Sequence, residues 1–165
     1  MIQIKQATKP EDFQTIEQLA REIFPGVYTP PMPLSHVLFF IDSFQTEKAI
    51  AEQIADKNYH YYLLCLDEQV TGYLGIQIQQ PNVHLSKLYI LKKFRGHKIG
   101  KAALEFVDVQ AQARQCTSID LYVNKLNEDT INIYQKAGYA IHQLVAHTYD
   151  NGHVEEDYHM VKTLS

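Results

Sequence analysis

The stretch FRGHKIGKAA, residues 94–103, gathers residue types that bind anions. Between positions 92 and 101 lie five of the chain's 15 Lys and Arg residues, although the whole chain has a formal net charge of −4. Gly96 and Gly100 lie in the same stretch, directly before an apolar helical pattern. Glycine lets backbone N–H groups converge on an anion, and the unpaired N–H groups of a helix's first turn attract phosphate. The stretch therefore predicts a loop that binds an anionic group.

The stretch does not match the known motifs for nucleotide phosphates or for nucleic acid. A Walker loop has four residues between its glycines and Ser or Thr after its Lys. Here three residues separate Gly96 from Gly100, and Ala102 follows Lys101. The dinucleotide fingerprint lacks its third glycine. Nucleic acid would require basic residues over a whole face with aromatic platforms, which one loop of an acidic chain does not supply. A solvated loop without a function stays the alternative.

Histidine is the other residue type that could do chemistry, and four of the eight His lie near the C-terminus. Only His153 and His159 share a strand face by alternation, and no cysteine joins them, so we predict no metal site. Elsewhere, His84 lies on the predicted strand that precedes the basic loop. A histidine there can accept a proton near neutral pH, although a lone strand histidine is more often a hydrogen-bonded structural residue.

Length and composition bound the class of protein. A chain of 165 residues, 45% hydrophobic and 21% charged, is typical of one ordinary globular domain, residues 1–165. No apolar run approaches the roughly 18 residues of a membrane helix, and the N-terminus lacks a signal-peptide pattern. The cysteines Cys65 and Cys116 do not suggest a disulfide framework. We therefore expect a cytoplasmic protein without membrane or nucleic-acid partners.

The elements that must position these residues follow from hydrophobic periodicity. Helices and strands alternate irregularly, so we expect a mixed α/β (α+β) domain with a largely meandering sheet. A proline-rich stretch, FPGVYTPPMPLS (24–35), predicts an ordered loop beside a site, and Asp150-Asn151-Gly152 predicts a turn. The expected helices are 10–23, 34–43, 46–56, 99–114 (with Ile99, Ala103, Phe106 and Ala113 on one face) and 128–137, and the expected strands are 1–7, 60–66, 69–79, 83–90, 118–123, 139–148 and 153–162.

The stretch VHLSKLYILKKFRGHKIGKAALEFV (83–107) resembles the central motif of the GCN5-related N-acetyltransferases (GNAT). That family has the pattern Q/R-x-x-G-x-G/A between a strand and a helix. Arg95, Lys98 and Gly100 occupy the patterned positions, with Lys98 in place of the family's middle glycine. This departure puts the tightness of the loop in doubt.

A second stretch, LYVNKLNEDTINIYQKAGYAI (121–141), resembles another motif of the same family. Asn127, Tyr134, Gly138 and Tyr139 fill its Asn, Tyr and Gly-aromatic positions in order. The resemblance covers about residues 60–145. Weaker similarity of FPGVYTPPMPL, YDNG and EDYHM points to the branch that includes bacterial spermidine/spermine acetyltransferases of the PaiA type.

The resemblance implies transfer of an acetyl group from acetyl-coenzyme A to a primary amine. It also implies the GNAT fold, a mixed, mostly antiparallel sheet of about seven strands, flanked by helices and splayed between the fourth strand (83–90) and the fifth (118–123). Coenzyme A is expected in this split. The residues expected to bind it are Leu88, Tyr89, Ile90, Arg95, Gly96, His97, Lys98, Ile99, Gly100, Lys101, Asn127 and Lys136.

Amine acetylation needs a base for the ammonium, a group that polarises the thioester, and an acid for the thiolate. From the resemblance we expect Tyr134 as the acid, and a backbone N–H within residues 88–90 as the polarising group. His84 is expected as the base, with Tyr28, Glu22 and water as rivals. The alternative, purely structural roles are a packed aromatic ring for Tyr134, a helix N-cap for Asn127 and a solvent-exposed side chain for Lys136.

The acceptor is expected beside the helices and loop of residues 24–44, with Tyr28 lining it. Nearby Glu22, Asp42 and Glu47 and the branch resemblance favour a small polyamine, although such acids usually form a solvated helix face. Protein or peptide amines, amino acids and aminoglycosides stay open as acceptors. A non-catalytic sensor or subunit that binds acetyl-coenzyme A is the alternative from a different class. Because dimers are common in the family that the sequence resembles, we also expect a homodimer.

Overall fold

The computed structural model describes residues 1–29, 32–150 and 152–165, in two compact units. The first unit contains Met1–Gln77 and Lys87–Ala103, and the second contains Ile78–Ser86 and Leu104–Ser165. The single domain expected over residues 1–165 stays a prediction. Two residues of the expected proline-rich loop (30 and 31) and Asn151 of the expected turn lie outside the described residues.

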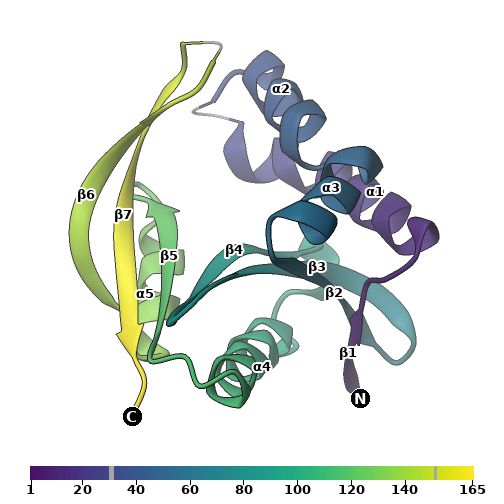
Figure 1. Cartoon of the computed structure of the whole chain (residues 1–165). Coiled ribbons are helices and arrows are strands. Elements are labelled where there is room, and N and C mark those ends of the chain that lie inside the picture. The colour runs from purple at the N-terminus through teal and green to yellow at the C-terminus, as the bar shows by residue number, and fades with distance from the viewer. Residues whose placement is uncertain (30–31, 151) are drawn as a thin grey trace. The chain divides into compact units, whose positions relative to one another are not determined.

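The element order follows the predicted order closely (Figure 1). The strand order is β1-β2-β3-β4-β5-β7-β6, with β4 parallel to β5, which confirms the predicted mixed seven-stranded sheet. The recorded β4–β5 pairs join only residues 82–84 of β4 to residues 118–120 of β5. The elements are β1 (Ile2–Gln6), α1 (Pro10–Tyr28), α2 (Leu34–Phe44), α3 (Glu47–Asp56), β2 (Tyr59–Leu66), β3 (Gln69–Gln79), β4 (Asn82–Ile90), the short 3-10 helix η1 (Lys92–Phe94), α4 (Ile99–Ala113), β5 (Ser118–Asn124), α5 (Glu128–Lys136), β6 (Ala140–Thr148) and β7 (Val154–Thr163).

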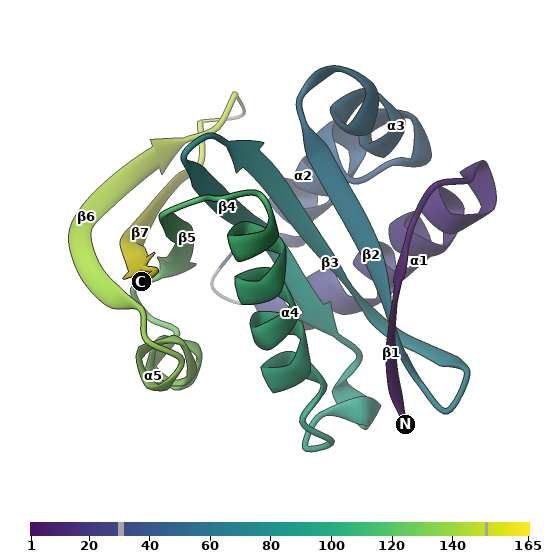
Figure 2. The ribbon, with the colours of Figure 1, turned by 60° about the horizontal axis from the view of Figure 1, so that its bottom comes forward.

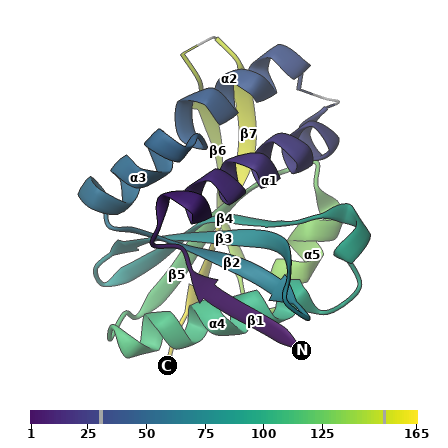
Figure 3. The ribbon, with the colours of Figure 1, turned by 90° about the vertical axis from the view of Figure 1, so that its right-hand side faces the viewer.

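In the first unit, helices α1, α2 and α3 lie together on one face of β1, β2 and β3 (Figure 3). The buried stripe of α1 repeats every three to four residues and includes Ile16, Leu19, Ala20 and Ile23, as its periodicity predicts. This stripe packs in one core cluster with β2 and β3 side chains such as Tyr61 and Tyr73. Burial of this stripe, rather than helix propensity alone, stabilises α1.

The N-terminal helix is longer than expected, because α1 runs to Tyr28 instead of ending at residue 23. Residues 24–28 were expected in the proline-rich loop 24–35, and this expectation was wrong, because they are helical. Proline removes one helical hydrogen bond and usually ends a helix. Here the fully buried Phe24 holds the segment in the core, and this packing outweighs the lost bond. Tyr28 consequently lies in the last turn of a helix.

The second unit is a sheet with two contrasting faces. One face carries the apolar residues Ile119, Leu121 and Val123 of β5, together with Met160 of β7, and all four are buried as alternation predicts. The other face carries the polar residues that alternate with them. The hairpin strands β6 and β7 pair from Ala140 opposite Val161 to Thr148 opposite Val154, with a register shift between Ile141 and Gln143. On α4, Ala113 is exposed, so its expected place on the apolar face was wrong; the buried positions are Ile99, Ala103, Leu104, Val107 and Ala111.

Candidate active site

The basic loop leads from β4 through η1 into α4 (Figure 2). Gly96 has φ +86° and Lys98 has φ +65°, so both residues adopt the left-handed conformation. Only glycine enters this region freely, and another residue loses about 1–2 kcal/mol there. The loop therefore keeps, at Lys98, the backbone shape that a glycine would take without strain. Lys98, in place of the family's middle glycine, therefore raises the conformational free energy of the loop while its backbone keeps a left-handed conformation.

Gly100, in the first turn of α4, is not needed by the fold. Glycine in a helix costs roughly 0.5–1 kcal/mol relative to alanine. A Cβ on Gly100 would meet only the Cδ1 atom of Ile90, at 3.5 Å, which is an ordinary contact. The chain itself thus leaves room for a methyl group that would stabilise the helix. A glycine at such a position fits a helix end that a ligand approaches closely.

The positive charges of the loop are directed to solvent. Among the described residues, no ion pair involves Lys92, Arg95, Lys98 or Lys101. The first-turn N–H groups of α4 have no helical partners either, and they add partial positive charge. The exposed cations around this helix start are Lys92, Lys93, Arg95, Lys98 and Lys101. The arrangement suits a phosphate-bearing ligand.

The last residues of β4 present backbone groups in two directions. The N–H of Leu91 donates to the carbonyl of Thr71 at 2.7 Å. A Cβ on Gly72 would lie 2.1 Å from the carbonyl oxygen of Tyr89, so Gly72 allows this close approach. Both groups therefore point toward β3. Because neighbouring residues of a strand direct their backbone groups oppositely, those of Ile90 point away from β3, as pairing with an extended ligand requires.

Tyr28 and Tyr89 are joined by a hydrogen bond between their hydroxyl groups. The Tyr89 ring also packs on Phe24, with ring centroids 4.5 Å apart, and on Tyr73, at 5.7 Å. The structure thus brings the predicted acceptor-lining residue Tyr28 onto the strand that was predicted to bind coenzyme A. Two of the acids expected with it have partners elsewhere: Asp42 accepts from Arg21 Nη2 at 2.9 Å, and Glu47 accepts from Gln14 Nε2 at 3.4 Å.

Lys87, two residues before Tyr89 on β4, has no counterpart in the sequence predictions. Its Nζ atom lies 5.6 Å from the ring centroid of Phe40. Desolvation lowers the pKa of Lys87 to about 8, because burial disfavours the charged amine. This lysine adds a titrating group to the strand that holds residues 88–90.

The second motif forms the end of β5 and the helix α5. Asn127 caps α5, since its side chain accepts from the N–H of Thr130 at 3.4 Å, which confirms the structural alternative for this residue. Tyr134 is half-buried, and desolvation raises its pKa to about 12. Its ring lies edge-on to that of Tyr139, 5.7 Å away. Gly138, at φ +103°, ends the helix in the left-handed conformation.

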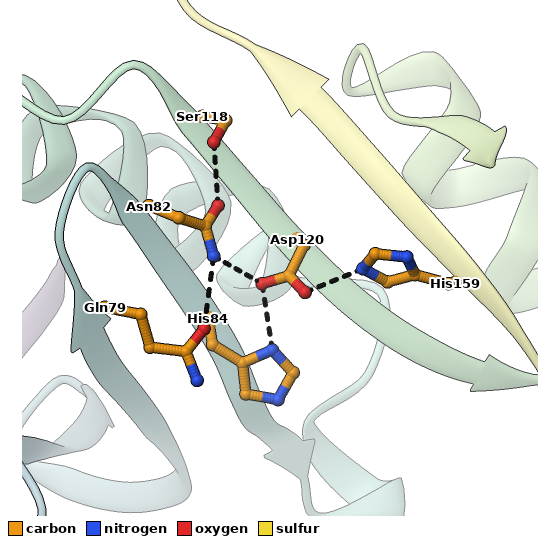
Figure 4. Close-up of polar contacts among 6 residues, drawn as sticks. All are labelled: Gln79, Asn82, His84, Ser118, Asp120 and His159. Atoms are coloured by element: carbon orange, nitrogen blue, oxygen red, sulfur yellow. Dashed lines mark hydrogen bonds and ion pairs between the residues drawn. The ribbon is translucent and has the colours of Figure 1, made fainter.

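His84 belongs to a hydrogen-bonded cluster that joins β4, β5 and β7 in the second unit (Figure 4). Its Nδ1 atom lies 3.0 Å from Asp120 Oδ1, and the other carboxylate oxygen lies 2.7 Å from His159 Nε2. Asn82 Nδ2 also donates to Asp120 Oδ1 at 2.8 Å, and Asn82 Oδ1 accepts from Ser118 Oγ at 2.9 Å. The lone strand histidine of the sequence analysis is therefore one member of a network centred on Asp120.

Asp120 is an ionised carboxylate held by this network. Burial alone would raise its pKa, but hydrogen bonds from His84, Asn82 and His159 and attraction to His84 lower it to about 2. An ionised carboxylate at His84 Nδ1 favours the tautomer with its proton on Nδ1. The Nε2 atom then carries the lone pair, which is the arrangement of a histidine ready to accept a proton.

A second carboxyl group, Asp157 on β7, lies on the same polar face but has fewer donors. Its side chain is 8% exposed, and its Oδ2 lies 3.8 Å from His147 Nε2. Burial and the neighbouring Glu155 raise the pKa of Asp157 to about 7. The ring of Tyr122 lies 4.8 Å from those of His147 and His159.

The sequence analysis predicted His84 but missed Asp120, His159 and Asp157 as site residues. An acid inside the buried strand SIDLYV was the available signal for Asp120, because strand interiors seldom hold an unpaired carboxylate. Asp120 lies between the two imidazoles, so the three groups do not converge on one point. Within the described part of the chain, no group of three or more His, Cys, Asp and Glu is arranged to hold a metal ion.

Comparison with known proteins places this geometry in a family. The acetyltransferase (GNAT) family model matches residues 13–139. An uncharacterized N-acetyltransferase of Mycobacterium tuberculosis is 28% identical over 155 residues, which span 93% of this chain and 98% of the relative. A spermidine N(1)-acetyltransferase of Thermoplasma acidophilum is 22% identical over 135 residues, which span 79% of this chain and 84% of the relative.

Solved structures share the fold at lower identity. The PaiA N-acetyltransferase of Thermoplasma acidophilum, crystallised with coenzyme A, has a TM-score of 0.81 and 19% identity, over 99% of both chains. The ribosomal-protein-S18-alanine N-acetyltransferase of Escherichia coli has a TM-score of 0.75 and 16% identity, over 100% of this chain and 95% of that one. No helix among the described residues is both long and apolar enough to cross a membrane. The chain belongs to the acetyltransferase (GNAT) family and is an acyltransferase that uses acetyl-coenzyme A.

Proposed function

We propose that this enzyme transfers the acetyl group of acetyl-coenzyme A to a primary amine of a small polyamine-like acceptor. The backbone of the loop carries the proposal: left-handed residues at Gly96 and Lys98 lead into a helix whose first turn keeps a glycine that the fold does not need. We assign the pyrophosphate of coenzyme A to the N–H groups and cations of this loop, residues 95–101. Residues 88–90, Asn127 and Lys136 complete the proposed coenzyme A contacts.

His84 is the proposed base. An alkylamine with a pKa near 10 is mostly protonated at neutral pH and must lose a proton before it attacks. Asp120, bonded to His84 Nδ1, leaves Nε2 to accept that proton and stabilises the imidazolium that results. Positioned bases of this kind contribute about 100- to 10,000-fold to the rate.

Tyr134 is the proposed acid that protonates the departing thiolate. Its pKa of about 12 keeps the hydroxyl protonated throughout the neutral range, as an acid requires. The proposed polarising group for the thioester oxygen is a backbone N–H of residues 88–90. That of Ile90 points away from β3, which supports this assignment.

A polyamine acceptor is supported by two observations. One relative is a spermidine N(1)-acetyltransferase, and the polar face of the second unit carries the carboxyl groups of Asp120, Glu155 and Asp157. Tyr28 is proposed to line the acceptor site. The free, buried cysteines Cys65 and Cys116 support the proposed cytoplasmic location. A homodimer is a further proposal, which sedimentation analysis would test.

A coenzyme A release assay tests the function. The full chain is mixed with acetyl-coenzyme A and, in turn, with spermidine, spermine, a lysine peptide and an aminoglycoside. We expect thiol release with the polyamines, and a loss of at least about tenfold in kcat for Tyr134→Phe with unchanged affinity for coenzyme A. Lys125→Gln is the control and should match the wild type, because the only ion pair of Lys125 among the described residues joins it to Glu156, at 2.8 Å.

Three outcomes would contradict parts of this proposal. Absence of acetyl-coenzyme A binding would overturn the assignment of the loop. Binding without turnover on every amine would favour the sensor or non-catalytic subunit. Turnover with the lysine peptide alone would replace the polyamine by protein amines.

A further inference from the structure

Asp157 has no role in the proposed acetyl transfer, yet its environment is unusual. Its side chain is 8% exposed, and its buried Oδ1 atom has no hydrogen-bond partner among residues 1–29, 32–150 and 152–165. The residue lies on the central strand of the β5–β7–β6 sheet, opposite Asn124 of β5 and Val145 of β6. A buried carboxyl oxygen without a donor is costly, and native structures rarely keep one unless something else satisfies it.

Glu155, on the same face of β7, is a second carboxyl group beside Asp157. It is held in place by Asn124 Nδ2, which donates to Oε1 at 3.1 Å, and by the Tyr149 hydroxyl, which donates to Oε2 at 3.2 Å. The nearest cationic candidate, His147 Nε2, lies 3.8 Å from Asp157 Oδ2 and forms no hydrogen bond with the described residues. Two carboxyl groups thus lie side by side, and only Glu155 receives hydrogen bonds from the described donors.

The titration of Asp157 agrees with this geometry. Burial, repulsion by Glu155 and a hydrogen bond with Glu155 raise its pKa to about 7. Near neutral pH the pair therefore retains a proton. Other titratable groups around this part of the sheet include His147 and His142 from β6, Tyr122 and Asp120 from β5, His159 from β7, and Tyr149 and His153 before β7. Tyr122 has a raised pKa, from burial and then from Asp120 and Asp157, so the field of Asp157 reaches the Tyr122 ring.

We propose that Asp157 and Glu155 bind an alkylammonium group of the acceptor, distinct from the amine that is acetylated. An ammonium has three N–H donors, so it can bond to the unpartnered Asp157 Oδ1 and neutralise the carboxyl pair at once. The site would make a second positive charge a requirement for good acceptors. This inference rests on the proposed function for its meaning, but binding at the site can be measured without turnover.

Two probes that differ by one charge test the site directly. Titration calorimetry compares 1,4-diaminobutane with 1-aminobutane on the full chain. We expect the diamine to bind at least about tenfold more tightly, as one desolvated charge pair provides. In Asp157→Asn and in Glu155→Gln, this preference should fall to less than about threefold, with 1-aminobutane affinity nearly unchanged. Glu156→Gln is the matched control, because Glu156 pairs with Lys125 at 2.8 Å instead.

The pH dependence gives a second readout. The ammonium displaces the proton that the carboxyl pair holds, so diamine affinity should rise about tenfold per pH unit below pH 7 and level off above it. In Asp157→Asn, the affinity for the diamine should not depend on pH in this way. Displacement of a proton from His147 would give a slope that survives in Asp157→Asn and disappears in His147→Gln, and that result would overturn the inference.

The ammonium site and the proposed acetyl transfer can be tested separately. Equal preference for the diamine in the wild type and in both carboxyl variants would overturn the ammonium site, whether or not acetyl transfer occurs. Loss of the preference in the variants, together with no turnover on any amine, would keep the site and reject the proposed reaction.

Discussion

Asp120 and Asp157 lie on the same face of one sheet, yet their pKa values are shifted in opposite directions. Both side chains are largely buried, with 14% and 8% of their surface exposed. Asp120 accepts hydrogen bonds from Asn82, His84 and His159, and its pKa is about 2. Asp157 has one oxygen without a hydrogen-bond partner in the described part of the chain and a second carboxyl group beside it, and its pKa is about 7.

The difference shows that donors, and not burial, decide the charge of a carboxyl group on this sheet. Burial raises the pKa of both groups, because it removes water from the ionised form. Three donors overcome this effect at Asp120, whereas Glu155 adds to it at Asp157. The enzyme thus has a fixed negative charge that can orient His84, and a protonated acid that a cation can ionise.

Asp120→Asn should have the largest effect. An amide has one acceptor oxygen where the carboxylate has two, so it cannot accept from Asn82, His84 and His159 at once. His84 therefore loses both its fixed tautomer and the charge that stabilises its imidazolium. We expect kcat/KM for the amine to fall about 100-fold, or roughly 2.7 kcal/mol, with little change in the affinity for coenzyme A. Steady-state kinetics from pH 6 to 9 would measure it.

Stability gives a second measure of the same change. The folded-state pKa of Asp120, about 2, lies below the ordinary value of 3.8. The contribution of Asp120 to the free energy of unfolding is therefore present above pH 4 and is lost as the pH falls toward 2. We expect Asp120→Asn to lower the free energy of unfolding by on the order of 2 kcal/mol at pH 7, and by much less at pH 2. An unchanged kcat/KM in a destabilised variant would leave Asp120 a purely structural role.

Asp157→Asn should act in the opposite direction, on stability. The folded-state pKa of Asp157 lies above its ordinary value of 3.8, so the unfolded chain releases this proton first and stability falls between about pH 4 and pH 7. Asparagine does not titrate. At pH 8 we expect the variant to be more stable by about 2 kcal/mol, or roughly 4–8 °C in Tm, and near pH 4 to match the wild type.

A melting series over pH 4–8 would check this, with Glu156→Gln as the control. A variant that melts lower than the wild type at every pH would mean that Asp157 is ionised and paired in the folded chain. The contrast with Asp120 would then be wrong.

The sequence predicted most of the fold and the basic loop because their signals are local. Periodicity defines each strand and helix from a few neighbouring residues, and the glycines and cations of residues 94–103 lie side by side in the chain. Even the N-cap Asn127 could be assigned from its position alone. The error at residues 24–28 shows the limit of local signals, since tertiary packing of Phe24 carried a helix through Pro25.

The polar face could not be predicted, because its contacts join residues far apart in the chain. His84 and His159 lie 36 and 39 positions from Asp120. Alternation places each residue on a face of its own strand, but the register between strands decides which residues meet. The β4–β5 pairing sets His84 opposite Asp120, and no pattern within either strand encodes that register. The contrast between Asp120 and Asp157 therefore emerges only in three dimensions.

Asn82→Asp should turn the first carboxyl group into a copy of the second. The new carboxyl group would lie where Asn82 Nδ2 now donates to Asp120 Oδ1 at 2.8 Å, so one donor is replaced by a like charge. The pKa of Asp120 should rise, and the pair should share a proton at acid pH. We expect a loss of about tenfold in kcat/KM at pH 6 that recovers above pH 8. A loss independent of pH would indicate misplacement of β4 instead.

Ser118→Ala should have the smallest effect, and it tests how far the network extends. Ser118 Oγ donates to Asn82 Oδ1 at 2.9 Å and so touches Asp120 only through Asn82. Its loss leaves all three donors of Asp120 in place, and a partly buried neutral hydrogen bond contributes about 0.5–1.5 kcal/mol to stability. We expect Tm to fall by a few degrees while kcat/KM changes by less than about twofold. A tenfold loss of activity would show that Ser118 fixes Asn82, and that the charge of Asp120 depends on the whole chain of donors rather than on the three that touch it.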